Sequence, residues 1–476
     1  MCENCNRREF MGVSAGSGLL LAAAQVKAQT EPATPPAGLP AKVQIAVIFA
    51  GKNSPPDRAW GVCQEEQAAM TERLKEIEAK LGNVEFVIGS ANNAAEASKL
   101  LKQAGVDAPV LVVNQSIRGL LNVSPPILEQ GRPLAVFSTP ASGHDWMYPF
   151  RWREEGKPVT MFATSDYGEL ERAARLLRVF PLLKKSRVLV FEPFRGTSPA
   201  CSIDAVREKL GVEVVVVGQD RFDALLAAVD EAKANADADE WLKGAKQTIE
   251  PTREDVLKAA RVSLALDKLV DEEKAQALAV GTCMGWLARG FPCLGFTRLR
   301  DRGIPASCEG DMDSLWTMLL FNTIFGIPGF QGNSTFDTAK NQVWTAHCVG
   351  PLMMDGPDGE AAPYLLRSHS EIGGGVVPEI QYRIGQPVTR AKLVNLDTLL
   401  VSTATIREVP EKSVRGCRTQ IVTEVGNASE MVRNWGGGVL EGDMMTLLHR
   451  VVFYGDHLQS ARHLADLMGL KVVQEG

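Results

Sequence analysis

The stretch SRVLVFEPFRGTSPACSIDAVREKLGVEVVVVG, residues 186–218, predicts the fold class of the chain. It begins with a β-branched apolar run, SRVLVFEP, of the length typical of a buried strand. Ser202 is placed to cap a following helix, and Gly211 is placed to end it. The apolar face of this helix consists of Ile203, Val206 and Leu210. Residues 212–217 begin a second apolar strand, which completes the strand–helix–strand unit from which parallel sheets are built.

The same alternation of apolar runs and amphipathic segments continues on both sides of this unit. The other strand candidates are KVQIAVIFAG (42–51), APVLVVN (108–114), PLAVFST (133–139) and ALAVGTC (277–283). These are too many for one sheet, so we expect two doubly wound α/β domains with parallel sheets. The boundary is expected near residue 165, before the helical segment SDYGELERAARLL, which gives an N-terminal domain of residues 42–165 and a central domain of residues 166–350.

The pattern changes after about residue 350. Glycine and proline become frequent, and the segments TLLVSTATIREV and CRTQIVTEV alternate in the period-two manner of half-buried strands. We therefore expect residues 351–476 to form an antiparallel β-rich domain. A terminal helix, capped by Asp456 and ended by Gly469, precedes a last strand, LKVV.

The N-terminus has the pattern of an export signal. Arg7 and Arg8 precede a short apolar run, residues 12–24, and Val26-Lys27-Ala28 fits a small-residue cleavage site. Residues 1–28 therefore predict a twin-arginine-like signal and a periplasmic location. The alternative is an uncleaved N-terminal helix, although the run is too short to span a bilayer. Residues 29–41 hold four prolines and are expected to form an extended linker.

Composition excludes some classes of partner. The chain has 476 residues, a net charge of −6 and 23% charged residues. Nucleic-acid binding requires clustered Lys and Arg, which this balance does not suggest. After the signal, no segment is apolar for long enough to be a membrane helix. The seven cysteines outside the signal are irregularly spaced, unlike a disulfide framework or a zinc ribbon. Small molecules are the expected partners.

Five polar residues near the ends of predicted strands are candidates for a metal site. They are Glu309 and Asp311 in IPASCEGD, Asn333 in PGFQGN, His347 in VWTAHC and His449 in LLHRVVFYGD. Side chains at strand ends of an α/β sheet point into the crevice where small molecules bind. Carboxylate, amide and imidazole ligands together suit Mn²⁺ or a similar divalent cation. The alternative is that Glu309 caps the next helix while the histidines are satisfied core groups.

Three segments are similar to the L-fucose isomerase and L-arabinose isomerase superfamily. They are PCLGFTRLRDRGIPASCEGDMDSLWTMLLF (292–321), PGFQGN (328–333) and LLHRVVFYGDHLQSARHLADLMGLKVV (447–473). In that superfamily a Glu after a strand, a second carboxylate about two dozen residues on and a C-terminal His hold Mn²⁺. The resemblance implies the fucose/arabinose isomerase-like fold, Glu309 and His449 as ligands, and a trimeric or hexameric homo-oligomer.

The resemblance fails at the second carboxylate. Asn333 stands where the fucose isomerases have Asp, and an amide can ligate a metal but cannot act as a base. The arabinose isomerases use a further His shortly after this position, which His347 resembles. Asp311 is either a replacement base or a residue that orients a ligand.

The expected reaction is interconversion of an aldose and a ketose through a cis-enediol. Glu309 would carry a proton at one face of the sugar, and Asp311, or a water held by Asn333, would act at the other. A metal would polarise the two sugar oxygens. Two alternatives remain open: a noncatalytic periplasmic sugar-binding protein on the same fold, and a metal-dependent epimerase or lyase.

Overall fold

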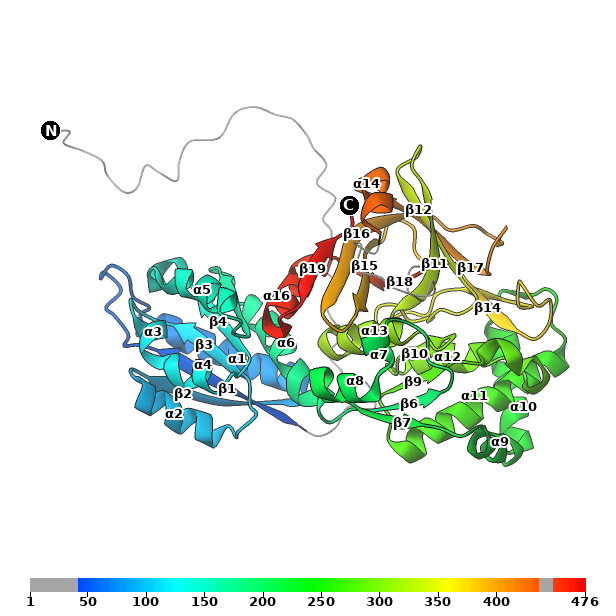
Figure 1. Cartoon of the computed structure of the whole chain (residues 1–476). Coiled ribbons are helices and arrows are strands. Elements are labelled where there is room, and N and C mark those ends of the chain that lie inside the picture. Colours follow the sequence, from blue (N-terminus) through cyan, green and yellow to red (C-terminus); the bar gives the residue numbers. More distant parts are fainter. Residues whose placement is uncertain (1–41, 414, 436–447) are drawn as a thin grey trace. The chain divides into compact units, whose positions relative to one another are not determined.

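The computed structural model describes residues 42–413, 415–435 and 448–476. The predicted export signal, residues 1–28, and the predicted linker, residues 29–41, lie outside the described residues. The described chain forms two parallel sheets, a larger antiparallel sheet and a small mixed sheet (Figure 1). This confirms the expected α/β architecture with an antiparallel β-rich region in its C-terminal part.

The first parallel sheet has the strand order β2-β1-β3-β4-β5. Alternate residues of β1 enter different cores: Ile45 and Val47 pack with helices α1 and α6 on one face, and Ile48 packs with α2 on the other. The strands are β1 Val43–Ala50, β2 Val84–Ala91, β3 Val110–Asn114, β4 Leu134–Ser138 and β5 Val159–Ala163. The helices along this part of the chain are α1 Gln64–Leu81, α2 Ala94–Gln103, α3 Gly119–Val123, α4 Pro125–Glu129, α5 Tyr148–Glu154 and α6 Glu169–Leu183.

The second parallel sheet has the order β10-β9-β6-β7 and contains the unit read from residues 186–218. As expected, the Ser202 hydroxyl caps the helix, 3.3 Å from the amide nitrogen of Ala205, and Gly211 ends the helix with a positive φ of 75°. The strands are β6 Arg187–Phe191, β7 Glu213–Val216, β9 Ala277–Val280 and β10 Ala306–Cys308. The helices are α7 Ser198–Cys201, α8 Ile203–Leu210, α9 Gln219–Ala227, α10 Glu231–Gly244, α11 Arg253–Glu273, α12 Cys293–Asp301 and α13 Met312–Phe325.

The antiparallel sheet has the order β15-β18-β11-β12-β17-β16-β19, and β15 also pairs with β16, which closes six of its strands into a barrel. Its strands are β11 Phe330–Asp337, β12 Gln342–His347, β15 Pro387–Val394, β16 Thr398–Glu408, β17 Thr419–Val425, β18 His449–Tyr454 and β19 Lys471–Gln474. The helices here are α14 Ala428–Asn434 and α16 Leu458–Met468. A small sheet joins β8 Gln247–Thr248, β13 Tyr364–Arg367 and β14 Val377–Ile380.

The change from parallel to antiparallel strands comes earlier than the boundary expected near residue 350. Strands β11 and β12 precede that position, but they pair with β18 and β17 of the barrel. The Gly- and Pro-rich segment after His347 therefore has barrel strands on both of its sides in the sequence. The strands before and after this segment complete one another's hydrogen bonds.

Helix α13 connects the second parallel sheet to the barrel. All of its residues are buried, and it packs against β9 and β10 on one side and β15 and β18 on the other. Asp311 caps its first turn and Gly326 ends it with a positive φ of 73°. The segment between β10 and α13, which contains Glu309, is thereby held next to the barrel strands.

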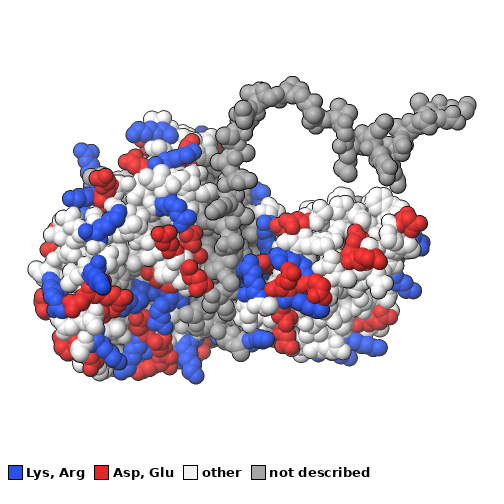
Figure 2. Space-filling model, turned by 180° about the vertical axis from the view of Figure 1, so that it is seen from behind, with Lys and Arg blue, Asp and Glu red and all other residues white. Residues whose placement is uncertain are grey.

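On the face seen in Figure 2, acidic and basic side chains are interspersed. None of the helices in the described residues has the length and apolar character needed to cross a membrane.

Candidate metal centre

Glu309 is the first residue after strand β10, at the carboxyl edge of the second parallel sheet. Its φ is +60°, a left-handed conformation that is strained for a residue with a side chain. Gly310 follows with φ +67°, and a Cβ atom on it would lie 2.4 Å from the carbonyl oxygen of Pro193. The loop after β6 thus packs closely against the turn, and this contact fixes the backbone at Glu309.

Asp311 is fully buried and makes four polar contacts. Its carboxylate caps α13 by accepting hydrogen bonds from the Ser314 amide at 2.9 Å and the Ser314 hydroxyl at 2.6 Å. It also pairs with the buried Lys392 ammonium at 2.8 Å and accepts a hydrogen bond from His449 Nδ1 at 2.9 Å. Burial alone would raise the pKa of Asp311, but Lys392 and His449 hold this pKa well below its usual value.

The contacts of Asp311 bear on the two roles considered for it. A carboxylate with no exposed surface and four partners orients other groups, so the geometry favours the orienting role over that of a base. Its buried charge is compensated by Lys392, a residue that the sequence reading did not identify. The alternative in which Glu309 caps the helix is wrong, because Asp311 occupies the cap position.

His449 begins strand β18 and has no exposed surface. Its Nδ1 lies 2.9 Å from the Asp311 carboxylate and 3.2 Å from the side-chain amide nitrogen of Gln331. A hydrogen on Nδ1, donated to Asp311, would leave a lone pair on Nε2. Nε2 is buried, has no hydrogen-bond partner and lies 3.9 Å from Glu309 Oε2. An imidazole nitrogen held in this way is the usual state of a metal-binding histidine.

His347 ends strand β12, and its ring also lies close to the Glu309 carboxylate. Its Nε2 lies 3.8 Å from Glu309 Oε1, and its ring packs edge to face against His449 with 5.2 Å between centroids. Its Nδ1 is buried without a partner. Burial, the main cause, together with the proximity of the His449 ring, lowers the pKa of His347 to about 3. The ring is therefore neutral at physiological pH, as a metal ligand must be.

The three side chains fit a divalent cation. One donor atom from each of Glu309, His347 and His449 lies within 4.8 Å of the other two. Nitrogen and oxygen ligands bind ions such as zinc at about 2.0–2.2 Å, so three donors spread evenly around one ion are roughly 3.6 Å apart. The side chains would have to approach one another by up to about 1 Å to bind one ion together. Two imidazoles and a carboxylate suit Mn²⁺ and several similar metals.

Asn333, the remaining predicted ligand, stands beside His449. The two residues are directly opposite each other in the β11–β18 pairing, so their side chains share a face. The Asn333 Oδ1 atom is buried and has no hydrogen-bond partner. Asn333 is therefore placed next to the three ligands with an unused acceptor, and its role as a fourth ligand stays a prediction.

The ionisation of Glu309 is affected by its burial. Burial raises the pKa of this carboxyl group, a proton on His449 would oppose the rise, and the negative charges of Asp311 and Glu371 add to it. A carboxyl group with a raised pKa can carry a proton near neutral pH.

Two cavities adjoin this group of residues. A cavity of about 370 Å³ is lined by polar and aromatic side chains that include Asn333, Trp344, Glu371 and Arg415. A second, of about 20 Å³, is lined by Glu309, His347 and the thiols of Cys283, Cys308 and Cys348. Only the first has the size of a site for a small ligand.

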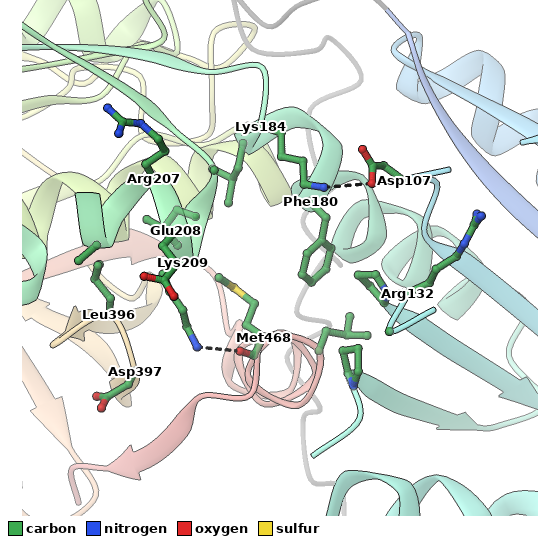
Figure 3. A pocket seen from close by; sticks show the side chains of 18 of the residues that line it. Asp107, Arg132, Phe180, Lys184, Arg207, Glu208, Lys209, Leu396, Asp397 and Met468 are labelled. Atoms are coloured by element: carbon green, nitrogen blue, oxygen red, sulfur yellow. Dashed lines mark hydrogen bonds and ion pairs between the residues drawn. The ribbon is translucent and has the colours of Figure 1, made fainter. Parts of the chain in front are cut away.

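A larger cavity, of about 760 Å³, lies elsewhere (Figure 3). It is bordered by the residues that precede β3 and β4, at the amino ends of the first parallel sheet, whereas ligands of such sheets bind at the carboxyl ends. Its lysines are already engaged: Lys184 lies 3.4 Å from Asp107, and Lys209 donates to the Met468 carbonyl at 3.4 Å. The metal centre is therefore the better candidate site.

Comparison with protein-family models and with curated proteins found no match to this chain. The assignment of a function consequently rests on the geometry of the site and on the sequence resemblance.

Proposed function

We propose that the protein is a metal-dependent aldose–ketose isomerase of the fucose/arabinose isomerase type. The observation that carries this proposal is the unpartnered, fully buried Nε2 of His449, aimed at Glu309 while Asp311 holds Nδ1. A buried imidazole nitrogen without a partner is costly unless a ligand completes it. Glu309, His347 and His449 would hold Mn²⁺ or a similar cation, with Asn333 as a further ligand.

Glu309, Asp311 and Asn333 would each have a separate role in moving a proton between C2 and C1 of the sugar. Glu309 would accept the proton at C2 of the sugar and return it at C1, which its raised pKa favours. Asp311 would keep the His449 ring in place without touching the substrate. A bound cation would polarise the sugar oxygens and stabilise the negative charge of the enediol. Asn333 would hold a water or a sugar hydroxyl through its free Oδ1.

The location and assembly of the protein are parts of the same proposal. Export through a twin-arginine-like signal, and a homo-oligomer of three or six chains, remain predictions from the sequence.

The test is elemental analysis of the wild type and of a Glu309→Ala, His449→Ala double variant after reconstitution with Mn²⁺. We expect about one metal ion per wild-type chain and none in the double variant. Aldoses and ketoses are then incubated with the loaded protein in D₂O, and deuterium at C1 or C2 is followed by NMR. A wild type without metal would overturn the proposal.

A noncatalytic sugar-binding protein is favoured by one observation. Asn333 replaces the second carboxylate, and Asp311 is buried, so Glu309 is the one carboxylate of the metal-ligand group in the described part of the chain. In that case sugars would bind to the metal-loaded protein without any deuterium exchange. Exchange with release of a different product would instead indicate an epimerase or a lyase.

A further inference from the structure

Two cysteines stand close together where strands β12 and β17 end their pairing. The strands are antiparallel, and their last pair at this end is His347 with Thr419. Cys348 follows that pair on one strand, and Cys417 lies two residues before it on the other. Their thiols are free in the structure and are joined by a hydrogen bond. The fold therefore brings together two sulfur atoms from distant parts of the sequence.

Each thiol of this pair lines one of the two cavities that adjoin the metal centre. Cys417 is partly exposed and lines the cavity of about 370 Å³. Cys348 is buried and lines the cavity of about 20 Å³ together with His347. A molecule in the larger cavity can therefore reach the Cys417 sulfur, while the Cys348 sulfur is shielded from solvent.

A histidine and a serine contact the thiol pair. The His369 ring is hydrogen-bonded to the Cys348 thiol, and its Nδ1 accepts a hydrogen bond from the Glu371 amide at 3.4 Å. The Ser370 hydroxyl lies 3.5 Å from Cys348 Sγ and also contacts Cys417. An imidazole next to a thiol can take up its proton, and the thiolate is the form that attacks another sulfur. The pair therefore has an accessible thiol, a second thiol and a proton acceptor, which suit thiol–disulfide exchange.

Three other thiols near the metal centre are less accessible. Cys283, Cys293 and Cys308 are buried and line the cavity of about 20 Å³, a space for about one water molecule. None of the three is among the described residues that line the larger cavity. A small molecule that enters the larger cavity therefore meets Cys417 first.

We infer that Cys348 and Cys417 form a redox-active pair, which a small-molecule disulfide entering the larger cavity oxidises to an internal disulfide. This inference goes beyond the proposed function and does not depend on a bound metal. Export, which the N-terminal sequence predicts, would take the chain to a compartment where disulfides form and persist. The new bond would join the segment before β17 to the end of β12, the strand that carries His347.

The oxidation proceeds in two exchange steps. The Cys417 thiolate attacks one sulfur of the small disulfide RSSR, which forms a mixed disulfide and releases RS⁻. The Cys348 thiol then gives its proton to His369, and its sulfur attacks the Cys417 sulfur, so that the internal bond forms and a second RS⁻ leaves. The two released thiolates take up the two protons that the cysteines have lost. In total, two protein thiols are oxidised and one RSSR is reduced to two RSH.

The test uses the full chain without added metal and oxidised glutathione as the small disulfide. The folded chain is equilibrated in glutathione buffers of defined redox potential, free thiols are blocked with iodoacetamide, and the peptides are analysed by mass spectrometry. We expect one peptide pair linked through Cys348 and Cys417, with a single reduction potential. Cys201→Ser is the matched control, since Cys201 is also partly exposed, and it should leave this potential unchanged.

Three variants test the order of the steps. In Cys348→Ser, we expect exchange to stop at a Cys417 that carries one glutathione. In Cys417→Ser, Cys348 should stay reduced at the same potentials, because its sulfur is shielded. His369→Gln should slow formation of the internal bond at least about 10-fold at neutral pH, since it removes the proton acceptor, while the reduction potential changes little.

Three results would overturn the inference. They are blocking of both cysteines by iodoacetamide at the most oxidising potential, a bond from either of them to a different cysteine, and a bond that forms only after the chain has been unfolded. The wild-type result decides by itself if a variant fails to fold, which circular dichroism shows. Because no Mn²⁺ is added, failure of the proposed function leaves this test intact.

Discussion

The carboxyl ends of the two parallel sheets carry similar polar residues but use them differently. At the first sheet, Asn114 accepts a hydrogen bond from the Leu120 amide at 3.0 Å and donates to the Ser142 carbonyl at 3.2 Å. Asp145 accepts from the amides of Arg118, at 3.1 Å, and Leu120, at 3.2 Å. These side chains are occupied in shaping the loops of their own domain.

At the second sheet, only part of the hydrogen-bonding capacity is used. Asp311 is fully engaged, but His449 Nε2, His347 Nδ1 and Asn333 Oδ1 are buried without partners. Backbone strain does not separate the two edges, because Arg118 at the first and Glu309 at the second both have a positive φ. Buried polar atoms without partners also occur at the first edge, at Asn92 Oδ1 and Thr139 Oγ1, so what marks the candidate site is that such atoms converge there.

The largest expected effect comes from removing the carboxylate charge at each edge. Asp311→Asn leaves the Lys392 ammonium buried without a counter-charge, so we expect the free energy of unfolding to fall by about 3–5 kcal/mol. Asp145→Asn keeps an acceptor for backbone amides and is expected to cost less than about 2 kcal/mol. Urea unfolding measures both.

The double variant Asp311→Asn, Lys392→Met is the control for this comparison, since it removes both charges. It is expected to be more stable than Asp311→Asn alone. An equal decrease in the free energy of unfolding for Asp311→Asn and Asp145→Asn would mean that the carboxylate at the second edge is not more strongly coupled to its surroundings than the one at the first.

A second prediction compares two buried histidines. His463 has both ring nitrogens engaged, with Thr160 at 2.7 Å and Gln459 at 3.1 Å, whereas His449 has a free Nε2. We expect His449→Ala to weaken Mn²⁺ binding on the order of 100-fold or more, since it removes a ligand. His463→Ala should lower stability but leave Mn²⁺ affinity unchanged.

Calorimetric titration with Mn²⁺ checks this prediction, under conditions where circular dichroism shows that both variants are folded. Similar losses of affinity in the two variants would indicate that the histidines matter for folding only and that no metal site exists at His449.

The layered α/β part of the fold was predictable because short-range signals agree there. Apolar runs, the Ser202 cap and the Gly211 stop each act within a few residues. The pairing of β11 and β12 with β18 and β17 was not predicted, because these strands are far apart in the sequence. Local pattern carries little information about such long-range pairing.

The candidate site was predictable in part for a similar reason. Glu309 and Asp311 follow a strand and the histidines stand near strand ends, so their convergence could be expected. Lys392 lies inside the strand PVTRAKLV, where it resembles an ordinary solvent-facing residue of an alternating strand. Its burial against Asp311 depends on how the barrel packs on α13, which no local signal shows.

The smallest expected effect concerns the ionisation of Glu309 in the metal-free protein. Burial raises its pKa above the value of about 4.3 in an unfolded chain. Between those two pKa values the folded state binds more protons than the unfolded state, so stability falls as pH rises through that window. Glu309→Gln removes this decline, and we expect the metal-free variant to be more stable than the wild type at neutral pH, by less than about 2 kcal/mol.

Mn²⁺ should reverse the sign of this pH dependence in proteins that keep Glu309 and should not do so in Glu309→Gln. The metal binds the ionised carboxylate, so the stabilisation of the folded state by Mn²⁺ grows with pH. At a free Mn²⁺ concentration of 100 times the dissociation constant, this stabilisation reaches about 2.7 kcal/mol. Burial also raises the pKa of Asp145, so Asp145→Asn should flatten the metal-free profile in the same direction while keeping the full response to Mn²⁺. Thermal unfolding between pH 4.5 and 8, with and without Mn²⁺, separates the two edges. A Glu309→Gln variant that still gains stability from Mn²⁺ would place the cation elsewhere, since this carboxylate joins both histidines in the metal-ligand group.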